Sequence, residues 1–148
     1  MAYETLIEEY PQIIIKEVIL PKGLSGVYFD NEIQLDKLRG KYEKHCILAE
    51  EIGHYETTYG DITDLRSMRN WKVELVARRW GYEKIVSLDK LIECFELGYK
   101  SLVEVCVHLE ITAEYLKTSI DHYFSRHGVS INHHGYEISF DPLFIRRV

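Results

Sequence analysis

The sequence predicts an α+β fold in which a small antiparallel sheet precedes several helices and a terminal β-hairpin. β-branched residues are concentrated before residue 36, apolar residues recur at helical spacing from residue 40 to 126, and short apolar runs return after Gly128. A chain of 148 residues is long enough to bury a hydrophobic core. We expect residues 1–85 to form a core and residues 86–148 to form a helical module with a terminal hairpin, the two packed as one unit.

The N-terminal segment is expected to begin with a short helix over residues 3–10, because the residue before Pro11 is driven out of the helical conformation. Runs of β-branched or aromatic residues follow at residues 13–15, 18–20, 26–29 and 32–35. The last two runs flank Asp30-Asn31, a pair that tolerates positive φ and suits a two-residue hairpin turn. Together the runs predict an antiparallel sheet of three strands.

The remainder of the chain carries helical spacing and helix-capping residues. The predicted helices span residues 40–55, 71–84, 88–97, 101–109 and 113–126. Residues 57–70 are predicted to form a loop. Ser87 and Ser101 are suited to cap the helices that follow them, and Ser101 with Glu104 has the spacing of a capping box. At the C-terminal end, residues 129–131 and 136–140 are expected to pair as a hairpin.

Composition and charge exclude several classes of protein. The net charge of −6 would repel a phosphate backbone, so direct nucleic-acid binding is not expected. Three widely spaced cysteines, Cys46, Cys94 and Cys106, favour reduced thiols over a disulfide framework. The acidic N-terminus lacks the pattern of a signal peptide, and no run of 18 apolar residues occurs. We therefore expect a soluble cytoplasmic protein without a membrane partner.

Residues 101–126 resemble a helix-turn-helix, and the hairpin after them could be taken for a wing. The second helix of this pair carries acidic and basic side chains in equal number, which does not suit a helix that lies in a phosphate-lined groove. We expect the segment to dock on the core or on a protein partner instead.

Residues 50–54 read Glu-Glu-Ile-Gly-His, which is the zinc-binding pattern His-Glu-x-x-His with glutamate in place of the first histidine. On a helix Glu50 and His54 lie about 40° apart and could share a metal ion, while Glu51 takes the position of the general base. An alternative interpretation treats Glu43, Glu50 and His54 as the solvated face of an amphipathic helix.

Glu74 is the candidate for a third metal ligand. Many zinc peptidases take a carboxylate from a second helix downstream, and Glu74 lies on a mainly apolar helix near small Ala77. The alternative is a surface ion pair between Glu74 and Arg78 at i+4 spacing. Two further candidates are set aside: His45 points about 140° away from Glu50 on a regular helix, and Cys46 is expected to pack in the core. His133 and His134 are expected to face solvent in the hairpin loop.

Four segments of the chain resemble the ImmA/IrrE family of metallopeptidases, most closely its short members encoded by prophages and integrative elements. These segments are Leu48 to His54, Tyr55-x-Thr57-Thr58-x-Gly60-Asp61, Glu74-x-x-Ala77-x-x-Trp80 and Leu20-Pro21-x-Gly23-Leu24-x-Gly26-Val27-Tyr28. The resemblance covers residues 3–145. It implies a zincin-like core over residues 1–85, in which the small sheet packs on the active-site helix.

The same resemblance implies roles for single residues and a kind of substrate. Glu51 matches the general base, His54 the second metal ligand and Glu74 the carboxylate ligand. Better-known members of the family cleave or inactivate a helix-turn-helix repressor. The resemblance therefore implies a zinc-dependent endopeptidase of a mobile genetic element that acts on a specific regulator of this kind.

Glu50 stands where the family usually has histidine, and this departure leaves two functions open. Two carboxylates would neutralise Zn²⁺ and acidify a bound water less, and an oxygen-rich ligand set favours harder ions such as Mn²⁺. The first hypothesis is a metallopeptidase with ligands Glu50, His54 and Glu74, which holds Zn²⁺ or Mn²⁺. The second is a non-catalytic binding protein, without a required metal, that controls a repressor by association.

Overall fold

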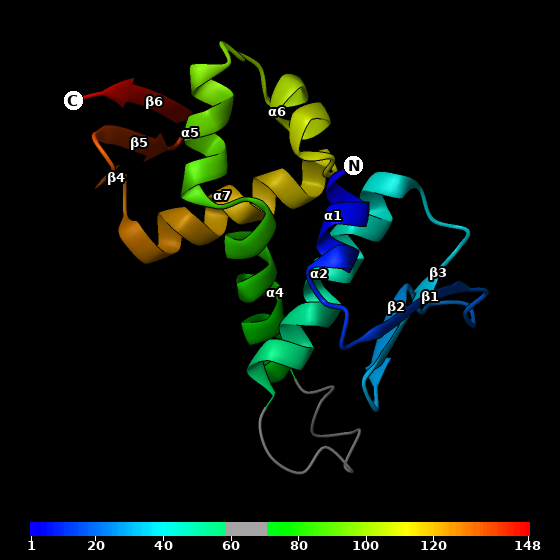
Figure 1. Cartoon of the computed structure of the whole chain (residues 1–148). Helices are drawn as coiled ribbons and strands as arrows, with labels where there is room; N and C mark the ends of the chain where they lie inside the picture. The colour runs from blue at the N-terminus through cyan, green and yellow to red at the C-terminus, as the bar shows by residue number, and fades with distance from the viewer. Residues whose placement is uncertain (59–70) are drawn as a thin grey trace.

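The computed structural model describes residues 1–58 and 71–148 of the chain (Figure 1). Helices occupy the middle of the molecule, and two small sheets lie at opposite ends of them, so the predicted α+β class is confirmed. Buried hydrophobic side chains from Tyr3 to Ile145 form one cluster. Within the described ranges, no helix has both the length and the apolar character needed to cross a membrane.

The N-terminal sheet differs from the predicted one in the direction of one strand. Its strands are β1 (Ile14–Val18), β2 (Gly26–Phe29) and β3 (Glu32–Asp36), in the order β1-β3-β2. The predicted hairpin joins β2 to β3 through Asp30 and Asn31, which both have positive φ. However, β1 lies beyond β3 and runs parallel to it, so the prediction of an entirely antiparallel sheet was wrong. A hairpin turn is encoded locally, whereas the partner of β1 is set by packing at a distance.

Two long helices cross at the centre of the molecule. They are α2 (Lys41–Thr57) and α4 (Trp71–Ile85), and α1 (Ala2–Glu8) packs beside α2. The crossing is close because Gly53 of α2 has no side chain: a methyl group there would overlap the carbonyl oxygen of Ala77 in α4. Residues 59–70, which include most of the predicted loop, lie outside the described residues.

Three further helices follow, and the first two begin at the predicted capping residues. They are α5 (Leu88–Glu96), α6 (Leu102–Leu109) and α7 (Ala113–His127). The Ser87 hydroxyl accepts a hydrogen bond from the backbone of Lys90, and Ser101 forms the predicted capping box with Glu104. Glu110 adopts a left-handed conformation with φ 58° and ends α6. These caps are encoded by local sequence. The bounds predicted for the helices from residue 40 onward agree with the structure to within about two residues.

The C-terminal sheet has three strands where the sequence predicted two. β4 (Ser130–His133) and β5 (Tyr136–Phe140) form the expected hairpin, and β6 (Leu143–Arg147) pairs with the other edge of β5. The prediction missed β6 because the run is short, follows Pro142 and ends in two arginines. In the structure the side chains of β6 alternate between the two faces of the sheet, since Phe144 is exposed and Ile145 is buried.

Candidate metal centre

Helices α2 and α4 bring the three predicted ligands together. Glu50 and His54 lie one turn apart on α2, and Glu74 lies in the first turn of α4. Their nearest oxygen and nitrogen atoms all lie within 4.8 Å of one another. The close crossing at Gly53 and Ala77 makes this possible. Gly53 is next to His54 on α2, and Ala77 lies about one turn from Glu74 on α4.

His54 is held inside the protein, although a solvated helix face was an alternative prediction. Its side chain is only 6% exposed, and its Nε2 lies 3.5 Å from Oε2 of Glu74. Its other ring nitrogen, Nδ1, is buried without a hydrogen-bond partner among residues 1–58 and 71–148. A buried polar group without a partner costs about 1–3 kcal/mol. A buried ring nitrogen without a partner needs a physical explanation, and a functional role of His54 supplies one.

The distance between His54 Nε2 and Glu74 Oε2 fits a zinc ion bound between them. Ligands at 2.0–2.2 Å from Zn²⁺ in a tetrahedral shell are about 3.3–3.6 Å apart. The 3.5 Å between His54 and Glu74 falls in this range. One imidazole and two carboxylates are also a chemically suitable donor set for Zn²⁺ or Mn²⁺. His54 and Glu74 are thus the members of the group that fit a divalent cation best.

Glu50 already has a cationic partner. Nε of Arg78 donates a hydrogen bond of 2.7 Å to Oε1 of Glu50, which links α4 to α2. This hydrogen bond is the main cause that raises the pKa of Arg78 above its ordinary value. A surface ion pair between Arg78 and Glu74 was one alternative that the sequence left open, and the guanidinium instead bonds across to Glu50. Arg78 is therefore a residue of the site that was not predicted from the sequence.

Glu51 lies on a different side of α2, where it meets the sheet. It is 6% exposed, and a Cβ added to Gly26 of β2 would lie 3.2 Å from Oε2 of Glu51. The strand β2 therefore passes directly over the predicted general base. Gly26 was not predicted to belong to the site, although a glycine inside a strand often marks a close backbone approach.

The two residues that the sequence set aside are indeed occupied elsewhere. The His45 ring donates a hydrogen bond from Nδ1 to the carbonyl oxygen of Glu110 over 2.9 Å. Burial is the main cause that lowers the pKa of His45. Burial also raises the pKa of Cys46 to about 11, so its thiol stays protonated and is a poor metal ligand.

The histidine pair of the hairpin differs from its prediction. The His134 side chain is 70% exposed, as expected, but that of His133 is only 26% exposed. Both rings form a hydrogen bond with the carboxylate of Asp89 at the start of α5, which the prediction of solvent-facing histidines did not include. This contact could not be predicted from local sequence, because Asp89 and His133 are 44 residues apart.

Comparisons of the chain with models of protein families, with curated proteins and with solved structures find no match in any of the three. The geometry of the residues and their chemistry therefore carry the functional argument.

Proposed function

We propose that this protein is a metal-dependent endopeptidase of the ImmA/IrrE kind, built on a zincin-like core. The observation that carries the proposal is the convergence of Glu50, His54 and Glu74 from two helices to within 4.8 Å. In this proposal the enzyme is a cytoplasmic product of a mobile genetic element. Its substrate is a specific regulator such as a helix-turn-helix repressor.

In the proposed mechanism Glu50, His54 and Glu74 would hold the metal, and the hydrogen bond from Arg78 to Oε1 would fix the position of the Glu50 side chain. When bound, the Zn²⁺ or Mn²⁺ ion polarises the scissile carbonyl and makes water a better nucleophile. The Glu51 carboxylate accepts a proton from the attacking water and delivers it to the leaving amine. Burial of Glu51 and His54 keeps bulk water away from this proton transfer.

The strand β2 is the proposed guide for the substrate. It is the outermost strand on one side of the β1-β3-β2 sheet, so one edge of its backbone is not paired within that sheet. It also lies against Glu51 through Gly26. A substrate that adds to this edge in extended form would place its backbone next to the general base.

The proposal predicts that Glu51→Gln abolishes proteolysis without loss of metal, because the amide keeps the shape of the side chain and cannot accept a proton. The measurement is the appearance of new protein N-termini, by mass spectrometry, in a bacterial lysate treated with the zinc-loaded protein. Glu43→Gln, an exposed change on the same helix, is the matched control. New N-termini that form equally with wild type and Glu51→Gln would contradict the proposed role of Glu51.

The ion pair between Arg78 and Glu50 favours a second candidate function. A carboxylate that is neutralised by a guanidinium is a weaker metal ligand, and a site reduced to His54 and Glu74 would hold a metal less firmly. The second candidate is a binding protein that controls a repressor by association alone. In that case Glu51→Gln would leave control of the repressor unchanged in cells.

A further inference from the structure

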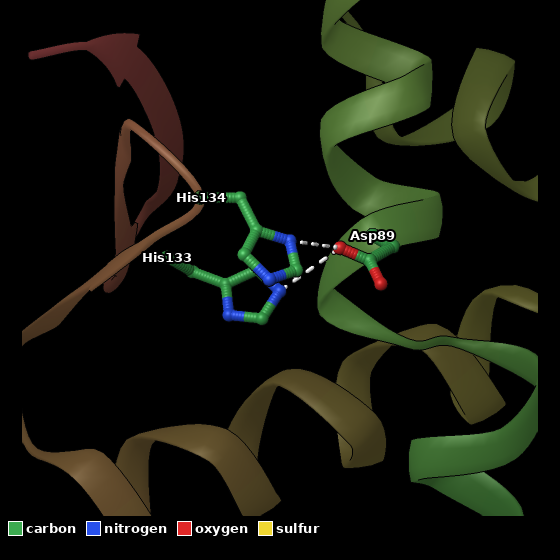
Figure 2. Close-up of side chains that lie close together, drawn as sticks. All are labelled: Asp89, His133 and His134. Carbon is green, nitrogen blue, oxygen red and sulfur yellow. Dashed lines mark hydrogen bonds and ion pairs between the residues drawn. The ribbon is translucent and has the colours of Figure 1, made fainter.

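We propose a second divalent-cation site, formed by Asp89, His133 and His134 where the β4–β5 hairpin meets the start of α5 (Figure 2). This site is separate from the group on α2 and α4, and it does not depend on the proposed peptidase function. Its three donor atoms lie within 4.8 Å of one another.

The geometry of the cluster is that of two rings directed at one carboxylate. His133 Nε2 lies 2.9 Å and His134 Nδ1 lies 3.0 Å from the same oxygen, Oδ1 of Asp89. Figure 2 shows both rings reaching from the hairpin toward α5, and their centroids are only 3.9 Å apart. Nitrogen atoms from two rings and one carboxylate oxygen therefore converge on a common point.

The turn of the hairpin is what places both rings on one side. Successive residues of a strand normally point to opposite faces. Here His133 is the last residue of β4, and His134 and Gly135 form the turn with φ of 47° and 84°. Asn-Gly or Asp-Gly is the usual choice for such a turn, and a histidine at its first position is uncommon. The left-handed backbone of His134 brings its ring beside that of His133.

The cluster can exchange its hydrogen bonds for a metal ion through a change of histidine tautomer. In the hydrogen-bonded form, each ring nitrogen that faces Asp89 carries a hydrogen. A neutral imidazole can instead hold its hydrogen on the other nitrogen, so that the facing nitrogen presents a lone pair. The change of tautomer alone makes His133 and His134 metal ligands, while Asp89 supplies the negative charge.

The chemistry of these donors selects the class of ion. Two imidazole nitrogens and one carboxylate oxygen suit Zn²⁺, Ni²⁺ or Cu²⁺ better than Mg²⁺ or Ca²⁺. The side chains of Asp89 and His134 are 67% and 70% exposed, so water can complete the coordination shell. A bound ion would connect the hairpin to α5 and stabilise the C-terminal sheet on the helices.

The test is a calorimetric titration of the full chain with ZnCl₂ after treatment with a chelator, in a His54→Ala background that disables the first site. We expect one Zn²⁺ to bind. His133→Gln and His134→Gln should each lower its affinity at least about tenfold, since loss of even an outer-shell partner commonly has that effect. Saturating Zn²⁺ should also raise the melting temperature by about 5 °C, and a chelator should reverse this rise.

The matched control is His108→Gln. His108 also bonds to a carboxylate, Glu93, over 2.8 Å, but it forms a pair rather than a group of three. We expect Zn²⁺ affinity to be unchanged in this variant. Because the His134 side chain is largely exposed, His134→Gln should fold normally, and a metal-free melting temperature equal to that of the His54→Ala parent checks this.

Two results would overturn the proposal. The first is an unchanged Zn²⁺ affinity in correctly folded His134→Gln. The second is no heat of binding and no shift in melting temperature in the parent, which would identify the cluster as a hydrogen-bonded contact only. Absence of metal from the α2–α4 site would bear on the peptidase proposal alone.

Discussion

At the level of single residues, position 50 is where this site departs from the His-Glu-x-x-His pattern. A carboxylate replaces an imidazole there, and Arg78 occupies that carboxylate at 2.7 Å. The hydrogen bond from Arg78 occupies Oε1 of Glu50 and reduces the negative charge that this carboxylate can offer to a metal ion. His54 Nε2 and Glu74 Oε2, in contrast, lie 3.5 Å from each other. The metal affinity of the site should therefore be limited by residues 50 and 78.

We predict that the double variant Glu50→His with Arg78→Ala binds Zn²⁺ at least about tenfold more tightly than wild type. The change restores a second imidazole and removes the competing guanidinium, and outer partners of a metal site typically change affinity by this factor. Calorimetric titration measures the effect. Arg79→Ala, a neighbouring exposed change, is the control and should leave the affinity unaltered. Equal affinity in the double variant and wild type would show that residue 50 does not contact the metal.

The buried ring of His45 should make the stability of the fold depend on pH. Burial lowers its pKa below the ordinary 6.5, so the folded protein keeps the ring neutral while the unfolded chain takes up a proton. The stability associated with the neutral ring is complete above about pH 6.5 and is lost as pH falls toward the lowered pKa. Below pH 6.5 this single group can change the free energy of unfolding by up to about 1.4 kcal/mol per pH unit.

His45→Asn separates this effect from that of other groups. An asparagine amide can donate the same hydrogen bond to the carbonyl of Glu110, but it does not titrate. Urea unfolding at pH 7.5 and pH 5.5 should show a smaller loss of stability in the variant than in wild type. An identical loss in both proteins would show that His45 does not account for the acid sensitivity.

At the level of elements, the site depends on how closely α2 and α4 cross. Gly53 and Ala77 meet at the crossing, and Glu50, His54 and Glu74 lie within one turn of them. Any side chain larger than hydrogen at residue 53 would push the two helices apart. The distance between His54 and Glu74 would then increase, because the two residues lie on different helices.

We predict that Gly53→Ala lowers the free energy of unfolding by about 1–3 kcal/mol, which is the usual effect of overpacking a well-packed contact. It should also lower the metal content, although no ligand is changed. Chemical denaturation and elemental analysis measure the two effects. The control is Gly40→Ala at the N-cap of α2, where a Cβ would meet only ordinary contact. This change weakens the cap but does not separate the helices, so the metal content should stay at the wild-type level. A Gly53→Ala protein with wild-type stability would show that the crossing is less tight than described.

The elements that the sequence predicted well are those encoded locally. The bounds of α2 and α5 follow from apolar spacing and from caps such as Ser87, and the β2–β3 turn follows from Asp30-Asn31. The parallel pairing of β1 with β3 and the existence of β6 depend on contacts between distant segments. Local pattern contains little information about such contacts.

The same distinction applies to the candidate site. Glu50 and His54 could be placed together from their i, i+4 spacing, and Glu74 from its position on an apolar helix. The link between Arg78 and Glu50 could not, since local spacing pointed to Glu74. The contact of Asp89 with the hairpin histidines was also out of reach, because it joins residues more than 40 positions apart.

At the level of the whole molecule, the helices position both candidate metal sites at different ends of the fold. The first lies where α2 and α4 cross, and the second lies where α5 meets the β4–β5 hairpin. The first combines burial, an unpartnered ring nitrogen and a nearby buried glutamate. The second is exposed and carries no comparable base in its group. A catalytic role is therefore proposed for the first, and a stabilising role for the second.

Whether α2 and α4 hold a metal ion through His54 and Glu74 can be measured by elemental mass spectrometry of gently purified protein. His133→Gln serves as background so that the hairpin cluster does not contribute. We expect close to one Zn²⁺ or Mn²⁺ per chain in this protein, and its loss in both His54→Ala and Glu74→Ala. No bound metal, even after addition of Zn²⁺ or Mn²⁺, would contradict the claim and favour a binding protein without catalytic activity.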